Sequence, residues 1–160
     1  MSDTTAIDWA ALRAAAVEMT SRSYAPYSGV RVGAAGVSAG APEVILLGCN
    51  VENASYGLGL CAECSLVSDL TRRGSGALVA VSIVAADRAP LAPCGRCRQV
   101  LFEFGGTTLL IDGGIEPGSA VVTLAELLPD AFGPDDVARR FPKPAFDMGP
   151  TLADAARAHG

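Results

Sequence analysis

The sequence contains little histidine, no excess of positive charge and no long apolar run. Its single histidine, His159, is the penultimate of 160 residues, and we do not expect it to bind a metal. Lys and Arg number 12 against 17 acidic residues, and the net charge of −5 argues against a nucleic-acid partner, since phosphate backbones attract mainly Lys and Arg. No apolar run approaches the roughly 18 residues of a membrane span, and no basic-then-apolar leader opens the chain. We therefore expect a cytoplasmic protein, without a membrane partner, that binds a small neutral molecule.

The chain is nevertheless apolar for its size. Half of its residues are hydrophobic, and the mean hydropathy is +0.35. A chain of 160 residues is long enough to form one domain with its own core. Buried subunit interfaces would account for the surplus of apolar residues, because such interfaces resemble a domain core cut in half.

The order of the predicted elements indicates an α/β fold with a mixed sheet. Strands are predicted over residues 30–37, 43–49, 77–86 and 107–111, and helices over 8–22, 62–73 and 95–104, with a short one from Thr123. The first two strands are joined by only a few residues, which predicts an antiparallel hairpin. Helices between the later strands imply parallel crossovers. Thr123 and Glu126 form a capping-box pattern at the start of the short helix.

Four of the five cysteines occur in two Cys-x-x-Cys pairs, Cys61/Cys64 and Cys94/Cys97. Thiolates are soft ligands that suit Zn²⁺, and this spacing is typical of zinc sites. Spacing alone favours a closed four-thiolate site that only stabilises the fold. A catalytic site remains open as well, with Cys61, Cys94 and Cys97 as ligands, water in the fourth position and Glu63 handling protons. A redox pair is a third interpretation.

The sequence around these cysteines resembles the small, free-nucleoside cytidine deaminases. The Cys61-Ala-Glu63 triplet followed by Pro-Cys-x-x-Cys is typical of zinc nucleoside deaminases. Further segments match that family in order and spacing: Tyr24–Ser28, Val32–Ala35, Cys49–Tyr56 and Pro93–Gln99. The resemblance runs from about residue 8 to 137, so we expect one domain over 1–137 and a tail over 138–160. It implies a three-layer α/β/α cytidine deaminase-like fold, and it favours the catalytic zinc over the structural one.

The resemblance implies a reaction and a set of catalytic residues. Cytidine and 2′-deoxycytidine would be hydrolysed to uridine and 2′-deoxyuridine with release of ammonia, as in pyrimidine salvage. One Zn²⁺ per chain would be held by Cys61, Cys94 and Cys97. Glu63 would take a proton from the attacking water and pass protons to N3 and the leaving amino group.

The resemblance also implies how the substrate is held. An amide and a carboxylate two residues apart suit sugar hydroxyls, and in the family the residues matching Asn50 and Glu52 bind the ribose. The backbone near Ala62 would meet the edge of the base. Tyr56 would lie at a subunit junction and Phe132 would reach over the substrate of a neighbouring subunit, within a homotetramer whose sites are completed by neighbouring chains.

Three positions depart from the family pattern or qualify it. Val30 stands where the family usually has a phenylalanine near the base. Cys64 stands where many members have an arginine that offsets the charge of three thiolates on zinc. We interpret Cys64 as a neutral thiol beside the ligands, with a spare ligand and inert packing as alternatives. Arg98 is the best candidate for a compensating cation.

Three other functions compete with this interpretation. A four-cysteine zinc module that only binds would not depend on Glu63. A deaminase of another aminopyrimidine nucleoside, of the blasticidin type, would share the mechanism but prefer a different substrate. A polynucleotide editor would require a basic surface, which this composition does not supply.

Overall fold

The computed structural model describes residues 7–112 and 121–140. It contains a five-stranded sheet in the order β2-β1-β3-β4-β5. The strands are β1 (Val32–Ser38), β2 (Ala41–Cys49), β3 (Leu78–Ala85), β4 (Leu110–Asp112) and β5 (Val122–Thr123). The helices are α1 (Trp9–Thr20), α2 (Ala62–Arg73), α3 (Gly95–Gly105), α4 (Leu124–Leu127) and α5 (Pro134–Arg140), with a 3₁₀ turn, η1, at Tyr56–Leu58. Among these helices, none combines the length and the apolarity needed to cross a membrane.

The sheet is mixed, as the sequence predicts. Strands β1 and β2 form the antiparallel hairpin, with Ala35 opposite Leu47. Strand β3 is also antiparallel to β1, so β2 and β3 run in the same direction on either side of it. Strand β4 pairs in parallel with β3. Helices α2 and α3 therefore make the two predicted parallel crossovers, while the short β5, antiparallel to β4, was not predicted.

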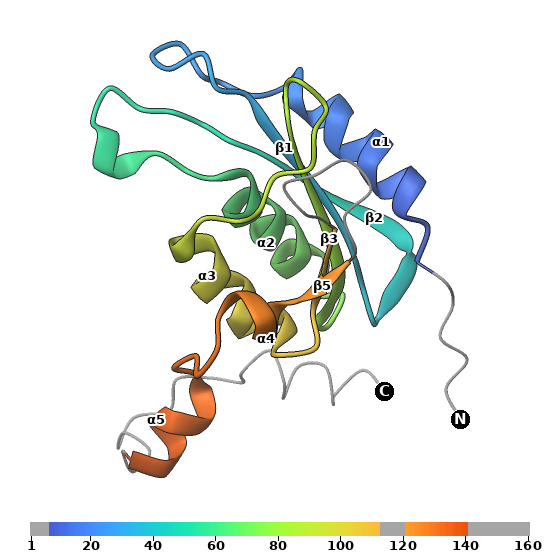
Figure 1. The fold of residues 1–160 in the computed structure, drawn as a ribbon, viewed down its shortest axis with the longest axis vertical. Coiled ribbons are helices and arrows are strands. Elements are labelled where there is room, and N and C mark those ends of the chain that lie inside the picture. The colour runs from blue at the N-terminus through green and yellow to red at the C-terminus, as the bar shows by residue number, and fades with distance from the viewer. Residues whose placement is uncertain (1–6, 113–120, 141–160) are drawn as a thin grey trace.

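Helices cover both faces of the sheet, which gives the predicted three layers. Figure 1 shows α1 on one side and α2 and α3 on the other. Two hydrophobic clusters fill the layers, and the neighbouring residues Ala34 and Ala35 of β1 face one cluster each. Leu66 of α2 and Leu101 of α3 are buried in the first cluster, and Leu12 of α1 is buried in the second. Burial of these side chains from water stabilises each layer contact.

Glycine allows strand β2 to approach the start of helix α2 closely. A Cβ atom built on Gly48 would lie 2.2 Å from the carbonyl oxygen of Ala62 and 2.5 Å from the backbone nitrogen of Leu66. Any side chain at this position would push the two elements apart. Helix α2 ends at Gly74, which has the left-handed φ of 65° that favours glycine at a helix C-terminus. These two glycines fix where α2 lies and where it stops.

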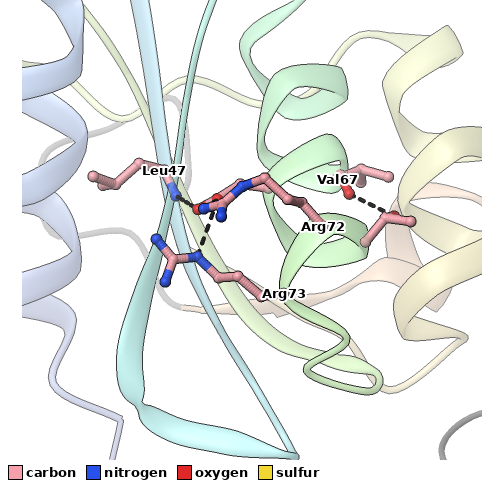
Figure 2. A network of polar contacts seen from close by, with 6 residues as sticks. Leu47, Val67, Arg72 and Arg73 are labelled. Carbon is pink, nitrogen blue, oxygen red and sulfur yellow. Dashed lines mark hydrogen bonds and ion pairs between the residues drawn. The ribbon is translucent and has the colours of Figure 1, made fainter.

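A carboxylate of helix α2, Asp69, binds the outer edge of strand β2 at Leu47. The backbone N–H of Leu47 donates to Asp69 at 3.3 Å, and Arg72 and Arg73 donate to the same carboxylate at 2.6 and 3.0 Å. Figure 2 shows both arginines beside the backbone of Leu47. Burial alone would raise the pKa of Asp69, but the two arginines and the Leu47 amide lower it. The outward N–H of Leu47 on this edge strand is thereby occupied rather than left open to pairing.

A buried carboxylate joins helix α1 to the middle of the sheet. Asp112, at the end of β4, is 0% exposed and accepts two hydrogen bonds of 2.6 Å from Nε and Nη2 of Arg13. The hydroxyl of Ser82 in β3 donates to the same carboxylate at 2.7 Å. Three elements far apart in the sequence are thus held together at one charged group.

The observed element boundaries differ from the predicted ones by a few residues. The first strand begins at Val32 rather than 30, because the side chain of Asn50 binds the carbonyl of Val30 and the N–H of Val32. Helix α1 ends at Thr20, not near residue 22. Helix α5 runs to Arg140, across the expected end of the domain at residue 137. The rest of the predicted tail, and His159, lie outside the described residues.

Candidate active site

Three thiols meet where helices α2 and α3 begin. Cys61 is the residue that precedes the first turn of α2, Cys94 does the same for α3, and Cys97 lies in the first turn of α3. Their sulfur atoms all lie within 4.8 Å of one another. Within the described residues, this is the one set of three or more Cys, His, Asp or Glu side chains that meets so closely. Cys64, although half-buried on the same helix, does not belong to it.

This donor set fits a zinc ion. Tetrahedral zinc with bonds of about 2.3 Å places its sulfur ligands roughly 3.8 Å apart, which the observed cluster can match. Burial, and the nearby Glu63 carboxylate, raise the pKa of Cys97, and burial also raises that of Cys61. For Cys94 burial acts in the same direction, but hydrogen bonds from Cys97 outweigh it and lower the pKa. A divalent cation would supply the positive charge that three neighbouring thiolates need, of which that of Cys97 is buried.

Glu63 lies in the first turn of α2, two residues after Cys61. It is 4% exposed, and its burial raises its pKa, although its own backbone N–H and Cys97 partly oppose that shift. A carboxyl group with a raised pKa exchanges protons more readily near neutral pH than an ordinary glutamate does. A proton-transfer group thus lies beside the cysteine cluster. Ala62, between these two residues, is also buried.

Asn50 is held by three hydrogen bonds at the end of β2. Its Oδ1 accepts from the hydroxyl of Ser23 and from the N–H of Val32, while its Nδ2 donates to the carbonyl of Val30 at 2.8 Å. An amide oxygen has two lone pairs and an amide nitrogen two hydrogens. The contacts therefore use both acceptor positions of Asn50 and leave one N–H for a ligand. The folded chain thus narrows the contacts that an amide could make with a sugar hydroxyl to donation from Nδ2.

Glu52 is bound by the turn that carries Tyr27 and Ser28. Both backbone N–H groups donate to Oε2, at 2.9 and 3.2 Å, and the Ser28 hydroxyl donates to Oε1. The Ser28 hydroxyl, followed by the Tyr27 amide, lowers the pKa of Glu52. These residues line a cavity of about 310 Å³, together with Asn53, Tyr56 and Gly59. That volume is in the range of small-molecule pockets.

The chain between the cavity and the cysteines is closed into a loop. Val51 and Leu60 form an antiparallel bridge through two backbone hydrogen bonds of 2.9 Å. Glu52 follows Val51 and Cys61 follows Leu60, so the two functional residues lie on opposite sides of this bridge. Arg96 of α3 donates to the carbonyl of Gly59 in this loop at 3.4 Å. The carboxylate side of the cavity and the cysteine cluster are thereby linked through a few residues of backbone.

Arg98 does not donate to a cysteine in the contacts that the structure gives. Its Nε donates to the carbonyl of Pro93 at 2.8 Å, and its Nη1 donates to the carbonyl of Leu127 at 2.9 Å. The neighbouring Gln99 donates to the carbonyl of Phe132 at 2.8 Å. The first turns of α3 therefore fix both the residue before Cys94 and the segment that carries Phe132.

The remaining predicted residues are apolar side chains that face solvent in the single chain. Tyr56 is 86% exposed, Phe132 is 57% exposed, and Val30 is also exposed. Sequence reasoning missed Ser23 and Ser28 as partners of Asn50 and Glu52. The signal available was weak: both hydroxyls lie in or beside a matching segment, but nothing in that segment shows which carboxylate or amide they bind.

The site corresponds to a known family region. The family model described as "Cytidine and deoxycytidylate deaminase zinc-binding region" matches residues 8–111, which include all three clustered cysteines and Glu63. The cytidine deaminase of Mycobacterium tuberculosis is 48% identical over 133 residues, covering 83% of this chain and 96% of its own. That of Halalkalibacterium halodurans is 37% identical, covering 76% and 92%.

Solved structures agree with these sequence matches. The crystal structure of the M. tuberculosis cytidine deaminase aligns with a TM-score of 0.73 at 46% identity, covering 80% of this chain and 99% of that one. The Mycobacterium leprae cytidine deaminase aligns with a TM-score of 0.70 at 49% identity, covering 78% and 99%. Sequence, fold and cysteine geometry lead to the same result, and the chain belongs to the cytidine deaminase family.

Proposed function

We propose that this chain is a zinc-dependent cytidine deaminase, which hydrolyses cytidine and 2′-deoxycytidine to uridine and 2′-deoxyuridine and releases ammonia. The observation that carries the proposal is the meeting of three cysteine thiols beside the buried carboxyl of Glu63. The 48% identity to the M. tuberculosis enzyme over most of both chains supports the same activity.

The catalytic roles follow from the positions of the side chains. Cys61, Cys94 and Cys97 would hold one Zn²⁺ per chain, which when bound makes a water molecule a stronger nucleophile near neutral pH. Glu63, kept from solvent in the first turn of α2, accepts the proton of the water that attacks C4 of the base. It delivers that proton to N3, takes a second proton from the hydroxyl that has added to C4, and passes it to the amino group, so that the C4–N bond breaks and ammonia departs with both protons of the water accounted for.

Asn50 and Glu52 would hold the sugar through a donor on one residue and an acceptor on the other, while other residues contact the base. Asn50 has one free N–H and Glu52 only acceptor sites, so a hydroxyl that accepts from the amide and donates to the carboxylate satisfies both. The backbone near Ala62 meets the edge of the base. Val30 leaves more space beside the base than a phenylalanine would.

The charge of three thiolates and Zn²⁺ sums to −1 and has to be offset. Two helix N-termini meet at the cluster, each contributing about 0.3–1 kcal/mol toward a negative group, or more when buried. Arg98 adds a cation four residues after Cys94 and holds the carbonyl that precedes that ligand. Cys64 is proposed to be a neutral thiol beside the ligands, not a fourth ligand.

Exposed side chains near the site support association with neighbouring chains, and the resemblance to the cytidine deaminases implies a homotetramer in which those chains complete each site. Tyr56 and Phe132 are both large and exposed. Tyr56 lines the cavity beside Glu52, and the carbonyl of Phe132 accepts from Gln99, two residues after Cys97. The protein is proposed to be cytoplasmic, because its five cysteines form no disulfide and a reducing compartment keeps thiols available for zinc. Residues 1–137 are proposed to form its one domain.

Substrate comparison with zinc-loaded protein tests this function. Ammonia release is measured with cytidine, 2′-deoxycytidine and blasticidin S at equal concentrations. We expect both nucleosides to be deaminated faster than blasticidin S. A preference for blasticidin S would favour the other aminopyrimidine deaminase, and no ammonia from any of the three would favour a zinc module that only binds.

A further inference from the structure

We propose that Ser28 is a positioning residue that orients the carboxylate of Glu52 so that one acceptor site remains for a sugar hydroxyl. The inference rests on the proposed function, because it assigns to Glu52 the sugar of a nucleoside. It adds a residue that acts through Glu52 rather than on the reacting atoms. Its carrying observation is the hydrogen bond from the Ser28 hydroxyl to Oε1.

The backbone holds Ser28 at this place independently of its side chain. The backbone of Tyr24 forms an isolated bridge to the segment after β2: its N–H donates to the carbonyl of Asn50 at 3.1 Å, and its carbonyl accepts from the N–H of Glu52 at 2.8 Å. The following turn closes where Gly29 donates to the carbonyl of Ala25 at 3.1 Å. Gly29 adopts φ of 72°, a conformation that favours glycine. The turn that carries Ser28 is therefore fixed against the segment after β2 that carries Glu52.

The hydroxyl of Ser28 has a defined direction. It accepts a hydrogen bond from the N–H of Val30 at 3.0 Å, so its own proton is free to point to Glu52. The chain of donors runs from the backbone beside the base, through Ser28, to the carboxylate beside the sugar. A serine at this position thus connects the two halves of the proposed substrate site.

The contacts from Tyr27 and Ser28 leave one acceptor site of the Glu52 carboxylate for a ligand. A carboxylate has about four lone-pair sites. The two backbone N–H groups of Tyr27 and Ser28 use those of Oε2, and the Ser28 hydroxyl uses one on Oε1. One site on Oε1 remains. Without the hydroxyl, Oε1 keeps its charge but loses the contact that sets its direction, because both backbone donors hold the other oxygen.

This assignment predicts an effect that depends on the sugar. Ser28→Ala is compared with the native protein and with Ser21→Ala, which removes an exposed hydroxyl whose partner within the described part of the chain is the carbonyl of Glu18. Dissociation constants are measured for uridine and for 2′,3′-dideoxyuridine, which lacks the 2′- and 3′-hydroxyls. Neither compound carries the amino group that deamination removes, so neither is consumed. We expect Ser28→Ala to raise the dissociation constant of uridine about tenfold, which corresponds to the loss of one hydrogen bond to a charged group. The dissociation constant of dideoxyuridine is expected to rise by less than about twofold.

Two further variants complete the test. Ser28→Thr keeps a hydroxyl and is expected to bind uridine within about threefold of the native protein, while Ser21→Ala is unchanged. Equal weakening of both ligands in Ser28→Ala would show a general structural role and overturn the proposal, as would no weakening of uridine. Turnover of cytidine by the native protein is measured separately, so a protein that binds uridine in this pattern without deaminating cytidine would overturn the proposed function alone.

Discussion

At the scale of single residues, the geometry separates Cys64 from the three clustered cysteines. Cys61 and Cys64 lie one helical turn apart at the start of α2, yet only Cys61 has its sulfur within 4.8 Å of both cysteines from α3. Spacing in the sequence makes the four cysteines look equivalent. The folded chain distinguishes them because a helix can direct only some of its first-turn side chains toward a second helix.

This difference predicts opposite results for two neighbouring substitutions. Cys61→Ala is expected to lose most of its bound zinc, since it removes one of three protein ligands. Cys64→Ala is expected to keep about one zinc per chain and its deaminase activity. Zinc content is measured by atomic emission on purified, dialysed protein. Loss of zinc from Cys64→Ala would instead indicate a four-thiolate site.

Arg98 and Arg96 provide a second matched pair. Arg98 holds the carbonyls of Pro93 and Leu127 at 2.8 and 2.9 Å, whereas the exposed Arg96 makes one contact of 3.4 Å to Gly59. We expect Arg98→Ala to lower kcat/KM by about tenfold or more, as for the loss of one charge-assisted hydrogen bond near the ligands, and Arg96→Ala by less. Steady-state kinetics of zinc-loaded variants decide this. Equal losses would exclude a special role for Arg98.

At the scale of helices and strands, the contact between α1 and the sheet depends on one buried carboxylate. Arg13 is 44% exposed on its side chain, but its partner Asp112 is fully buried. Among the described residues, removing Arg13 leaves Asp112 with the Ser82 hydroxyl as its side-chain partner, and a buried charge that loses its ionic partner is strongly destabilising. This buried carboxylate therefore makes the Arg13–Asp112 pair more important for stability than the exposed pair of Arg72 with Asp69.

Arg13→Ala is expected to lower the free energy of unfolding by about 3 kcal/mol. Arg72→Ala serves as its control, because Arg72 is 68% exposed and its pair with Asp69 is worth less than about 1 kcal/mol. Urea unfolding of zinc-loaded protein measures both. If the two substitutions cost the same, the buried carboxylate does not anchor α1 as described.

Sequence patterns predicted the elements that local chemistry determines. The bounds of α2 at 62–73 were predicted correctly, because a left-handed glycine, Gly74, ends the helix. The capping box at Thr123 was also confirmed, with its N–H bound to Glu126 at 2.7 Å. Strand β5 was missed because two residues give no periodicity, and its pairing with β4 depends on tertiary contacts.

The site was predictable only where its residues follow a motif. The cysteine ligand set and Glu63 come from short spacings near two helix starts. The contacts of Ser28 with Glu52 and of Arg13 with Asp112 join residues 24 and 99 positions apart. Such pairs depend on the register of the sheet and on where α1 packs, which one sequence does not show.

At the scale of the whole molecule, the single chain leaves large apolar side chains in solvent beside its candidate site. Tyr24, Tyr27, Leu58 and Leu60 are exposed, in addition to Tyr56. Large apolar side chains that gather in solvent near one site are typical of a surface that binds another protein. We expect a homotetramer of four 16.3 kDa chains in sedimentation equilibrium at micromolar concentration. A monomer under these conditions would contradict the proposed completion of each site by its neighbours.

The central claim, an open zinc site served by Glu63, is tested most directly by the ultraviolet spectrum of cytidine during incubation with protein that carries one zinc per chain. Glu63→Gln, of similar size and matched in zinc content, is the control. The account predicts conversion to the uridine spectrum by the native protein and a rate at least about 100-fold lower in the variant. No conversion by the zinc-loaded native protein, or equal rates for both, would contradict it.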